Sequence, residues 1–125
     1  MSRDKFCEEI KAKFPTISAK AEKEYIRLWG DFKSELYSYT WFEALAGALN
    51  IEMNKGVPPK EYQALFSTVS SRFLSGDVDV KQAIDVAFVE NLFWNVSSSA
   101  SELYWNTLPE VLKDLYLNFH RRKPY

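Results

Sequence analysis

Hydrophobic side chains recur at every third or fourth position along most of the chain, and no segment alternates apolar and polar residues as a half-buried strand does. This spacing places the apolar side chains on one face of a helix, which is then buried against other helices. We therefore predict an all-α fold, with residues 1–125 forming a single-domain bundle of about six helices. The predicted helices lie near residues 3–14, 18–29, 40–56, 58–75, 79–95 and 107–119, with a short turn of helix from residue 99.

Three of these helices have inward faces that can be specified from the sequence. In the second helix, Tyr25, Leu28 and Trp29 are predicted to point into the core. The third helix has a stripe of small residues within positions 44–48, which would let another helix approach closely. In the last helix, the predicted inward side chains are Leu108, Val111, Leu112, Leu115 and Phe119.

Several helix starts are marked by polar residues. A serine or threonine followed three residues later by glutamate has the spacing of a capping box, in which each side chain covers an unpaired N–H of the first turn. After Gly76, either Asp77 or Asp79 is expected to cap the next helix. The capping-box spacing occurs at Thr40 and Glu43, at Ser99 and Glu102, and at Thr107 and Glu110.

The segment "IDVAFVENLFW" at residues 84–94 is apolar on both sides of its predicted helix. This pattern is typical of a central helix packed between layers, and we place that helix near residues 79–95. Asn91 falls inside an apolar arc, so we predict a buried amide that joins two helices or a helix and a loop. Asp85 and Glu90 fall on the flanks of the helix, where they either reach solvent or contact a neighbouring helix.

The formal net charge is only −1, but the charges are unevenly distributed. Residues 1–33 contain eight basic and six acidic side chains, residues 34–118 contain five basic and eleven acidic ones, and the tail from residue 119 contains three basic ones. The middle of the chain is therefore acidic and lies between basic ends. This acidity argues against a large basic face, so we predict no direct binding of nucleic acid despite the tail "HRRKPY".

The cysteine content and the N-terminus favour a cytoplasmic protein. Cys7 is the only cysteine, so the chain has no intramolecular disulfide. The first residues, "MSRDKFCEEIK", are charged throughout and do not resemble a signal peptide. No segment approaches the roughly 20 apolar residues of a membrane span. We therefore predict a cytoplasmic location and no membrane partner.

Residues suited to catalysis or metal binding are scarce. The single histidine, His120, lies in the basic tail beyond the last apolar position, where its charge would complement a helix C-terminus. Cys7 lies between core-facing positions and is expected to be a half-buried, inert thiol. With one histidine and one cysteine the chain has no transition-metal motif, and its glycines form no phosphate-binding loop. We predict no catalytic residue, metal or cofactor, and a protein that is not an enzyme.

The acidic middle of the chain is the main candidate for a binding surface. Carboxylates gathered on one surface would attract a basic protein and speed its association. Part of this acidity has a structural explanation as well, because some of the acids stand at helix caps. The residues predicted to bind a partner are Glu35, Glu43, Glu52, Glu61, Asp77 and Asp79.

Four short segments carry a family resemblance: "YTWFEALAGAL" at 39–49, "LF" at 65–66, "SGD" at 75–77 and "AFVENLF" at 87–93. Together with "FP" at 14–15, they resemble a family of small bacterial all-α domains of largely unknown function. Some members resemble immunity proteins of polymorphic toxin systems, including contact-dependent growth inhibition. The resemblance covers roughly residues 35–120 and supplies no catalytic motif.

The leading hypothesis from this resemblance is an immunity protein that binds a cognate toxin domain, such as a basic nuclease, and occludes its active site. The alternative is a non-enzymatic regulatory or adaptor domain that binds a host protein, with a partner helix in a groove beside Trp41 and Phe42. A homodimer is compatible with either hypothesis. An enzyme would instead need Asp85, Glu90 and a third acid to converge in one pocket.

Overall fold

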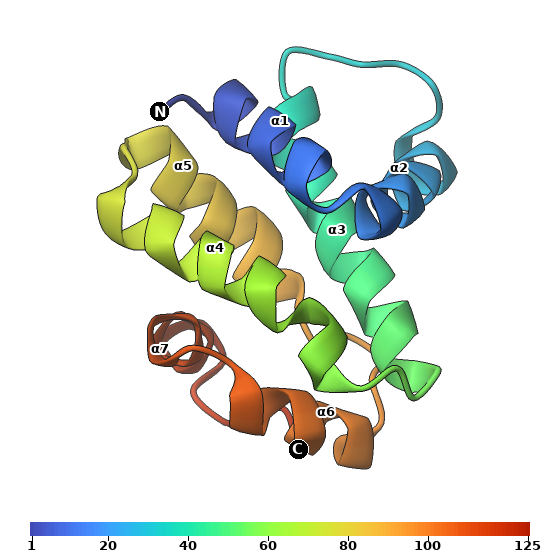
Figure 1. Ribbon diagram of the computed structural model, residues 1–125, viewed down its shortest axis with the longest axis vertical. Coiled ribbons are helices and arrows are strands. Elements are labelled where there is room, and N and C mark those ends of the chain that lie inside the picture. Colours follow the sequence, from blue (N-terminus) through green and yellow to red (C-terminus); the bar gives the residue numbers. More distant parts are fainter.

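A helix with one apolar face can bury that face only against another element, so a chain of such helices folds as a bundle. The computed structural model describes residues 1–125 and is helical throughout, without strands (Figure 1). This confirms the predicted fold class. The α-helices are α1 (Arg3–Lys13), α2 (Pro15–Trp29), α3 (Tyr37–Asn54), α4 (Gln63–Ser75), α5 (Val78–Gln82), α6 (Ser98–Thr107) and α7 (Glu110–His120). A 3-10 turn η1 (Pro59–Tyr62) precedes α4, and a π-helical segment η2 (Ala83–Phe88) and a 3-10 turn η3 (Val89–Asn91) continue α5.

Helix α3 is the central element of the bundle. It packs against α1 and α2 as well as against η2 and η3, and Figure 1 shows it crossing the molecule diagonally while α6 and α7 lie at the lower end. Trp41, Leu45 and Leu49 of α3 are completely buried. The ring of Phe42 stacks on Phe6 of α1, with ring centroids 4.8 Å apart. Burial of each such side chain stabilises the fold by about 1.5–3 kcal/mol.

The small residues of α3 allow α2 to approach closely, as predicted. A Cβ atom on Gly47 would lie 3.5 Å from Oε2 of Glu24 in α2. Ala48 is buried one residue further on. The contact between α2 and α3 is the most extensive contact between any two elements of the fold. The stripe of small side chains therefore sets the main helix–helix contact of the N-terminal half.

The predicted central helix near 79–95 is helical through α5, η2 and η3, but its winding changes along its length. The backbone widens to π-helical turns in η2, tightens in η3 and becomes extended at Leu92. Ile84 and Phe88 are completely buried, whereas Val86 is exposed. One broad face of this segment is thus covered by protein and a narrower one is open to solvent.

The buried amide in this region belongs to Asn50 of α3, and the prediction of a buried Asn91 is wrong. The side chain of Asn91 is exposed, and its Nδ2 donates to the carbonyl of Ala87, one turn earlier, at 2.8 Å. Asn50 donates from Nδ2 to the carbonyl of Asn91 at 2.9 Å and accepts at Oδ1 from the N–H of Phe93 at 2.8 Å. Periodicity located the apolar arc correctly, but it could not show that the helix ends there.

A second asparagine, Asn54, repeats this arrangement one helical turn later on α3. Its Nδ2 donates to the carbonyl of Asn95 at 2.8 Å, and its Oδ1 accepts from the N–H of Ser97 at 3.0 Å. Together Asn50 and Asn54 satisfy main-chain groups that a loop would otherwise leave without partners. They fix the path of residues 91–97, which connect η3 to α6.

The predicted helix caps were only partly correct. Asp77 caps α5 as expected, by accepting from the N–H of Val80 at 3.1 Å. Thr40 lies inside α3, where its hydroxyl bonds to the carbonyl of Leu36 at 3.1 Å. Capping-box spacing is also compatible with a helix interior, so local sequence alone cannot decide between the two. The three predicted capping boxes are wrong: α3 begins at Tyr37, Ser97 caps α6, and α7 begins after Pro109.

The predicted burial of inward-facing side chains is wrong in the last turns of α2 and α7. Tyr25 of α2 is buried as predicted, but Leu28 and Trp29 in its last turn are exposed. Phe119 in the last turn of α7 is also exposed, and Tyr116, one turn earlier, is buried instead. Leu28, Trp29 and Phe119 lie on the outer sides of these last turns and remain exposed, although His120 in the last turn of α7 contacts η3.

Candidate functional site

Three carboxylates without basic partners lie where α3 meets the segment that follows α5. Glu43 comes from α3, Asp85 from η2 and Glu90 from η3, and α3 packs against both of these segments. Their charges act jointly on the nearby hydroxyl of Tyr39, whose pKa is raised by burial and then by Glu43, Glu90 and Asp85. We call Glu43, Asp85 and Glu90 the acidic cluster.

The electrostatics of the acidic cluster are unfavourable in the isolated protein. All three carboxylates are partly buried. Burial raises the pKa of Glu43 and of Asp85, and both burial and the charge of Asp85 raise the pKa of Glu90. None of the three carboxylates forms an ion pair, although the guanidinium of Arg3 lies 5.7 Å from the ring centre of Tyr39 and its charge lowers the pKa of Tyr39. The Nε of Arg3 donates to the hydroxyl of Ser38 at 3.0 Å, and Arg3 forms no ion pair with the acidic cluster.

Other partly buried acids of the protein have basic partners. Glu9 accepts from the guanidinium of Arg72 at 2.8 Å, and Glu22 lies 3.5 Å from the ammonium of Lys33. Half-buried charge is usually compensated in this way because an isolated charge in a poorly solvated site is costly. The acidic cluster departs from this pattern, which makes it the strongest candidate for binding a positively charged group.

Glu52 does not lie on the surface, in contrast to its predicted place in an acidic binding face. Its carboxylate is 2% exposed and accepts from Lys20 Nζ at 2.5 Å and from the Tyr62 hydroxyl at 2.7 Å. Burial works to raise its pKa, but the hydrogen bonds from Lys20 and Tyr62 outweigh burial, so the pKa lies below its ordinary value. Glu52 joins α2, α3 and η1 within the fold and is not available to a partner.

The other predicted binding residues lie far apart. Helix α3 rises by about 1.5 Å per residue, so Glu35 before its start and Glu52 near its end are separated by roughly 25 Å. Glu61 lies on η1, and Asp77 and Asp79 lie at the start of α5, where Asp77 is 4.0 Å from the N-terminal ammonium. Of the six predicted residues, Glu43 alone belongs to the acidic cluster.

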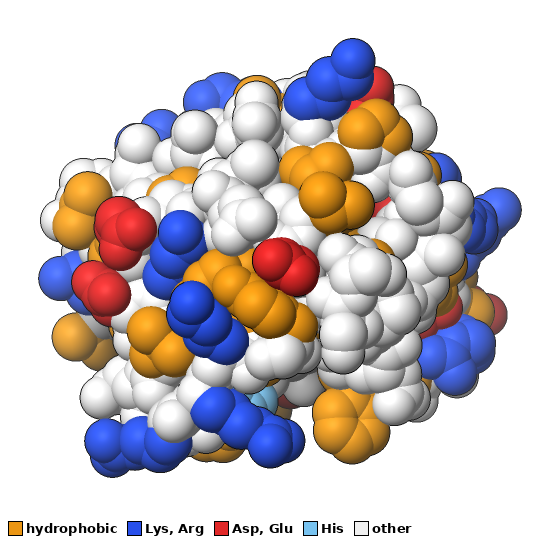
Figure 2. Space-filling model, turned by 90° about the horizontal axis from the view of Figure 1, so that it is seen from below, with side chains coloured by type: hydrophobic (Ala, Val, Ile, Leu, Met, Phe, Trp, Pro, Cys, Tyr) orange, Lys and Arg blue, Asp and Glu red, His pale blue; other side chains and the backbone are white.

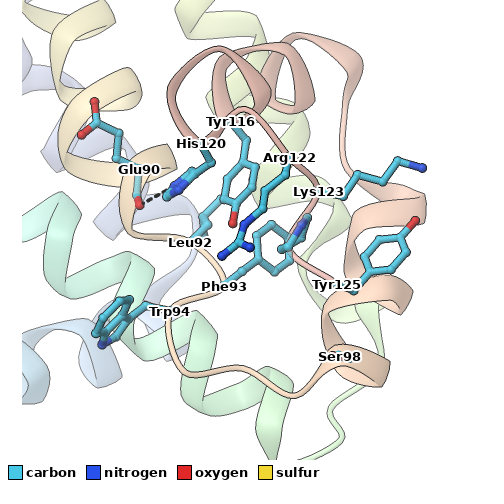
Figure 3. A pocket seen from close by; sticks show the side chains of 11 residues that line it. Glu90, Leu92, Phe93, Trp94, Ser98, Tyr116, His120, Arg122, Lys123 and Tyr125 are labelled. Carbon is cyan, nitrogen blue, oxygen red and sulfur yellow. Dashed lines mark hydrogen bonds between the residues drawn. The ribbon is translucent and has the colours of Figure 1, made fainter.

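A pocket of about 370 Å³ lies next to the acidic cluster, below η3 and beside the C-terminal tail (Figure 3). Its inner wall is aromatic, since the Phe93 ring packs edge-on against Tyr116 with centroids 5.5 Å apart. Of the acidic cluster only Glu90 contributes to its lining, and Figure 3 shows the Glu90 carboxylate directed away from the pocket. The lining residues are Glu90, Leu92, Phe93, Trp94, Ser98, Tyr116, His120, Arg122, Lys123, Pro124 and Tyr125.

Unusual backbone conformations shape this pocket. Phe93, Asn95 and Arg121 have φ angles of 69°, 55° and 63°, in the left-handed region that residues with a Cβ rarely adopt. Phe93 is held there because its ring is 6% exposed and its N–H bonds to Asn50. At Arg121 the left-handed conformation ends α7 and turns the tail back over the pocket.

The sequence placed His120 in the tail, beyond the last core position. In the structure, His120 instead lies between the pocket and the acidic cluster. Its Nε2 lies 3.1 Å from the carbonyl oxygen of Glu90. Because a carbonyl oxygen can only accept, Nε2 carries the hydrogen and donates. The imidazole also stacks on Tyr116, with ring centroids 4.1 Å apart. The main chain of Glu90 is thereby fixed to α7 while its carboxylate belongs to the acidic cluster.

The remaining candidates for chemistry are inaccessible. Cys7 is buried, and burial raises the pKa of its thiol to about 12, so the nucleophilic thiolate is suppressed. No group of three or more His, Cys, Asp or Glu side chains is arranged to hold a metal ion. None of the helices combines the length and the apolar character that a membrane crossing requires. Trp41 and Phe42 are both completely buried, so the predicted groove beside them does not exist.

Sequence reasoning located part of this site. It singled out Asp85 and Glu90 as polar residues within an apolar segment, and it included Glu43 among the acids of the middle region. It could not bring the three together, because their proximity depends on how α3 packs against η2 and η3. The aromatic pocket was missed altogether, since the left-handed turns at Phe93 and Arg121 carry no glycine signal.

Comparison with known proteins gives a family and no assigned activity. No curated protein matches the chain, and no solved structure matches it. One family model does match, over residues 7–122, which is almost the whole chain. The protein therefore belongs to the family described as a domain of unknown function, DUF7674.

Proposed function

We propose that this protein is a cytoplasmic immunity protein that binds a cognate, basic toxin domain one-to-one and occludes its active site. The observation that carries the proposal is the acidic cluster, whose three partly buried carboxylates have no basic partner within the chain. A toxin that cleaves nucleic acid needs a basic substrate channel. An arginine or lysine from such a channel would supply the missing positive charge.

Binding energy would come from completing this charge arrangement. Each carboxylate of the acidic cluster has lost part of its hydration without gaining a partner, so part of the cost of desolvation is met before binding. A guanidinium that enters the cluster would form charge-assisted, bidentate hydrogen bonds. The Tyr39 hydroxyl, whose pKa responds to all three carboxylates, is the nearby polar group that could add a further contact.

The surroundings of the acidic cluster suit a protein interface. Val86 is exposed beside Asp85, and Trp94, which follows η3, is 73% exposed. Exposed tryptophan is a frequent energetic centre of protein interfaces, where its large ring displaces water. Apolar contacts next to a compact charged site would combine affinity with orientation.

The direct test is co-expression with the toxin domain encoded by the neighbouring gene. Cells should survive, and the two chains should co-elute at one-to-one stoichiometry in size-exclusion chromatography. Glu43→Lys and Asp85→Lys should each slow association about tenfold or more at low salt and much less at high salt, because salt screens the attraction. Glu102→Lys, at an exposed position of α6, is the matched control and should leave the association rate unchanged. Toxin activity that persists in the presence of the wild-type protein, with no complex, would refute the proposal.

An adaptor that binds a host protein is the second candidate, and a different surface supports it. Trp29 at the end of α2 and Phe32 and Leu36 in the following connection are exposed, with Phe32 at 77%. Exposed apolar side chains of this size often mark interaction surfaces. If this surface binds the partner, Trp29→Ser and Phe32→Ser should abolish complex formation, while Glu43→Lys should have no effect.

A further inference from the structure

We propose that the pocket between η3, α6 and the C-terminal tail is a binding site for a phosphate monoester carried on a flat, apolar group. This site is separate from the acidic cluster, and its ligand has the opposite charge. The inference goes beyond toxin binding and does not depend on it. Charge, size and rigidity of the pocket each support the assignment.

The charge of the pocket favours an anion. Arg122 and Lys123 line it, and neither forms an ion pair with any acid of the chain. Figure 3 shows the Arg122 side chain extending across the pocket towards Phe93 and Tyr116, whereas Lys123 lies at the rim. Glu90 is the single acid in the lining, and its carboxylate points away. In Figure 2, Lys and Arg side chains gather around the histidine at one edge of the lower face.

A helix start adds to the attraction for an anion. Ser98 lines the pocket and is the first residue of α6, whose first-turn N–H groups have no partners within the helix. The Ser97 hydroxyl covers the N–H of Ala100 at 3.3 Å, which leaves the earlier amides available. The positive end of the helix dipole therefore reinforces the cationic side chains. Two cations and a helix start match a dianion better than a monoanion, which favours phosphate over carboxylate.

The size and walls of the pocket indicate what carries the phosphate. A volume of about 370 Å³ is much larger than an inorganic anion requires. The rest of the space is bounded by Leu92, Phe93 and Tyr116 on the inner side and by Pro124 and Tyr125 on the tail side. Phe93 and Tyr116 are each only 6% exposed and form the apolar floor, whereas the exposed ring of Tyr125 offers a face on which a planar ring can stack. The ligand class is therefore an aryl or heteroaryl phosphate.

The pocket is rigid on its inner side. The main chain of residues 91–97 is bonded to Asn50 and Asn54, and Phe93 is kept in a strained conformation by its buried ring. Strain of this kind persists only where surrounding packing imposes it, and it is concentrated at ligand sites. A preformed inner wall lowers the entropic cost of binding a small molecule.

The test uses the full chain and phenyl phosphate as the probe, with binding followed by calorimetry and by NMR chemical shifts. Phenyl phosphate should bind saturably and shift the signals of Phe93, Tyr116 and Ser98. Arg122→Gln should weaken binding roughly tenfold, because a charge-assisted hydrogen bond is lost. Lys123→Gln should weaken it by a smaller factor, since Lys123 lies at the rim.

Controls separate the proposed site from general attraction to a charged surface. Lys23→Gln removes an exposed cation from α2 and should leave binding unchanged. Inorganic phosphate and phenol should each bind more weakly than phenyl phosphate, and benzoate should bind more weakly because it has one charge. No saturable binding at millimolar concentration, an equal loss in Lys23→Gln, or tighter binding of benzoate would overturn the proposal. All the variant positions are exposed, so circular dichroism should show an unchanged fold.

Discussion

Glu52 is a carboxylate whose partners lie on two other elements. Its oxygens accept from Lys20 on α2 and from Tyr62 on η1, and Lys55, the residue that follows α3, lies 3.7 Å away. At 2% exposure it has almost no water to replace these bonds. Glu61, only nine positions further along the chain, is exposed and has no such partner. Two glutamates that look equivalent in the sequence thus have different physical roles.

Replacing these two glutamates by alanine should therefore have unequal effects. Glu52→Ala leaves the Tyr62 hydroxyl and the Lys20 ammonium without their partner, so we expect the free energy of unfolding to fall by about 2 kcal/mol. Glu61→Ala is the control, with an expected change within about 0.5 kcal/mol. Urea denaturation measures both as shifts of the midpoint at constant slope. Equal midpoints for the two variants would contradict the role assigned to Glu52.

At the scale of elements, most of the fold could be predicted from the sequence. Helical periodicity depends on burial of one face, and such burial is what builds α1, α3, α4 and α7. The prediction failed where tertiary contacts override local preference: at helix ends, at the π-helical winding of η2 and at the left-handed Phe93. The candidate site could not be predicted in full for the same reason, because its geometry depends on those irregular segments.

The contact between α1 and α4 has a pH dependence that follows from one ion pair. Hydrogen bonds from Arg72 on α4, together with Lys13, lower the pKa of Glu9 on α1 to about 2 from an ordinary value of 4.5. Because the pKa of Glu9 is lower in the folded state, this pair stabilises the protein fully only at pH values above the ordinary pKa of 4.5. The stabilisation is lost as the pH falls from 4.5 towards 2.

Glu9→Gln should therefore be less stable than the wild type at pH 7, by about 1 kcal/mol for a partly exposed pair. The difference should shrink as the pH falls through this window. Thermal unfolding measured across the pH range tests this, and Glu8→Gln, at an exposed position of the same helix, is the control. A stability difference that does not change with pH would show that the pair contributes through packing and not through charge.

At the scale of the whole molecule, a small net charge conceals two sites of opposite sign. The acidic cluster and the cationic pocket share Glu90, which contributes its carboxylate to one and its main chain to the other. His120 holds that main chain in place. The surface is therefore organised to attract a basic group and an anionic group at neighbouring positions.

Neutralising the acidic cluster should raise the stability of the protein. The pKa of each carboxylate in the cluster is raised in the folded state, so the charged carboxylates destabilise the fold at neutral pH. This destabilisation disappears as the pH falls and the carboxylates become protonated. The triple variant Glu43→Gln, Asp85→Asn and Glu90→Gln should be more stable at pH 7, by about 0.2–0.5 kcal/mol for the relieved repulsion between Asp85 and Glu90. Urea midpoints at neutral and acidic pH measure the effect. A triple variant that is less stable than the wild type at pH 7 would mean that the carboxylates have stabilising partners.

The two asparagines of α3 have a consequence for how this surface can evolve. Asn50 and Asn54 bond only to main-chain atoms of residues 91–97, and every residue has such atoms. The hydrogen bonds that hold this connection thus do not depend on the side chain at an exposed position such as Trp94, whereas Asn95 is constrained by its left-handed φ. Substitution of Trp94 should therefore change the surface chemistry of this connection while the scaffold beneath keeps its shape.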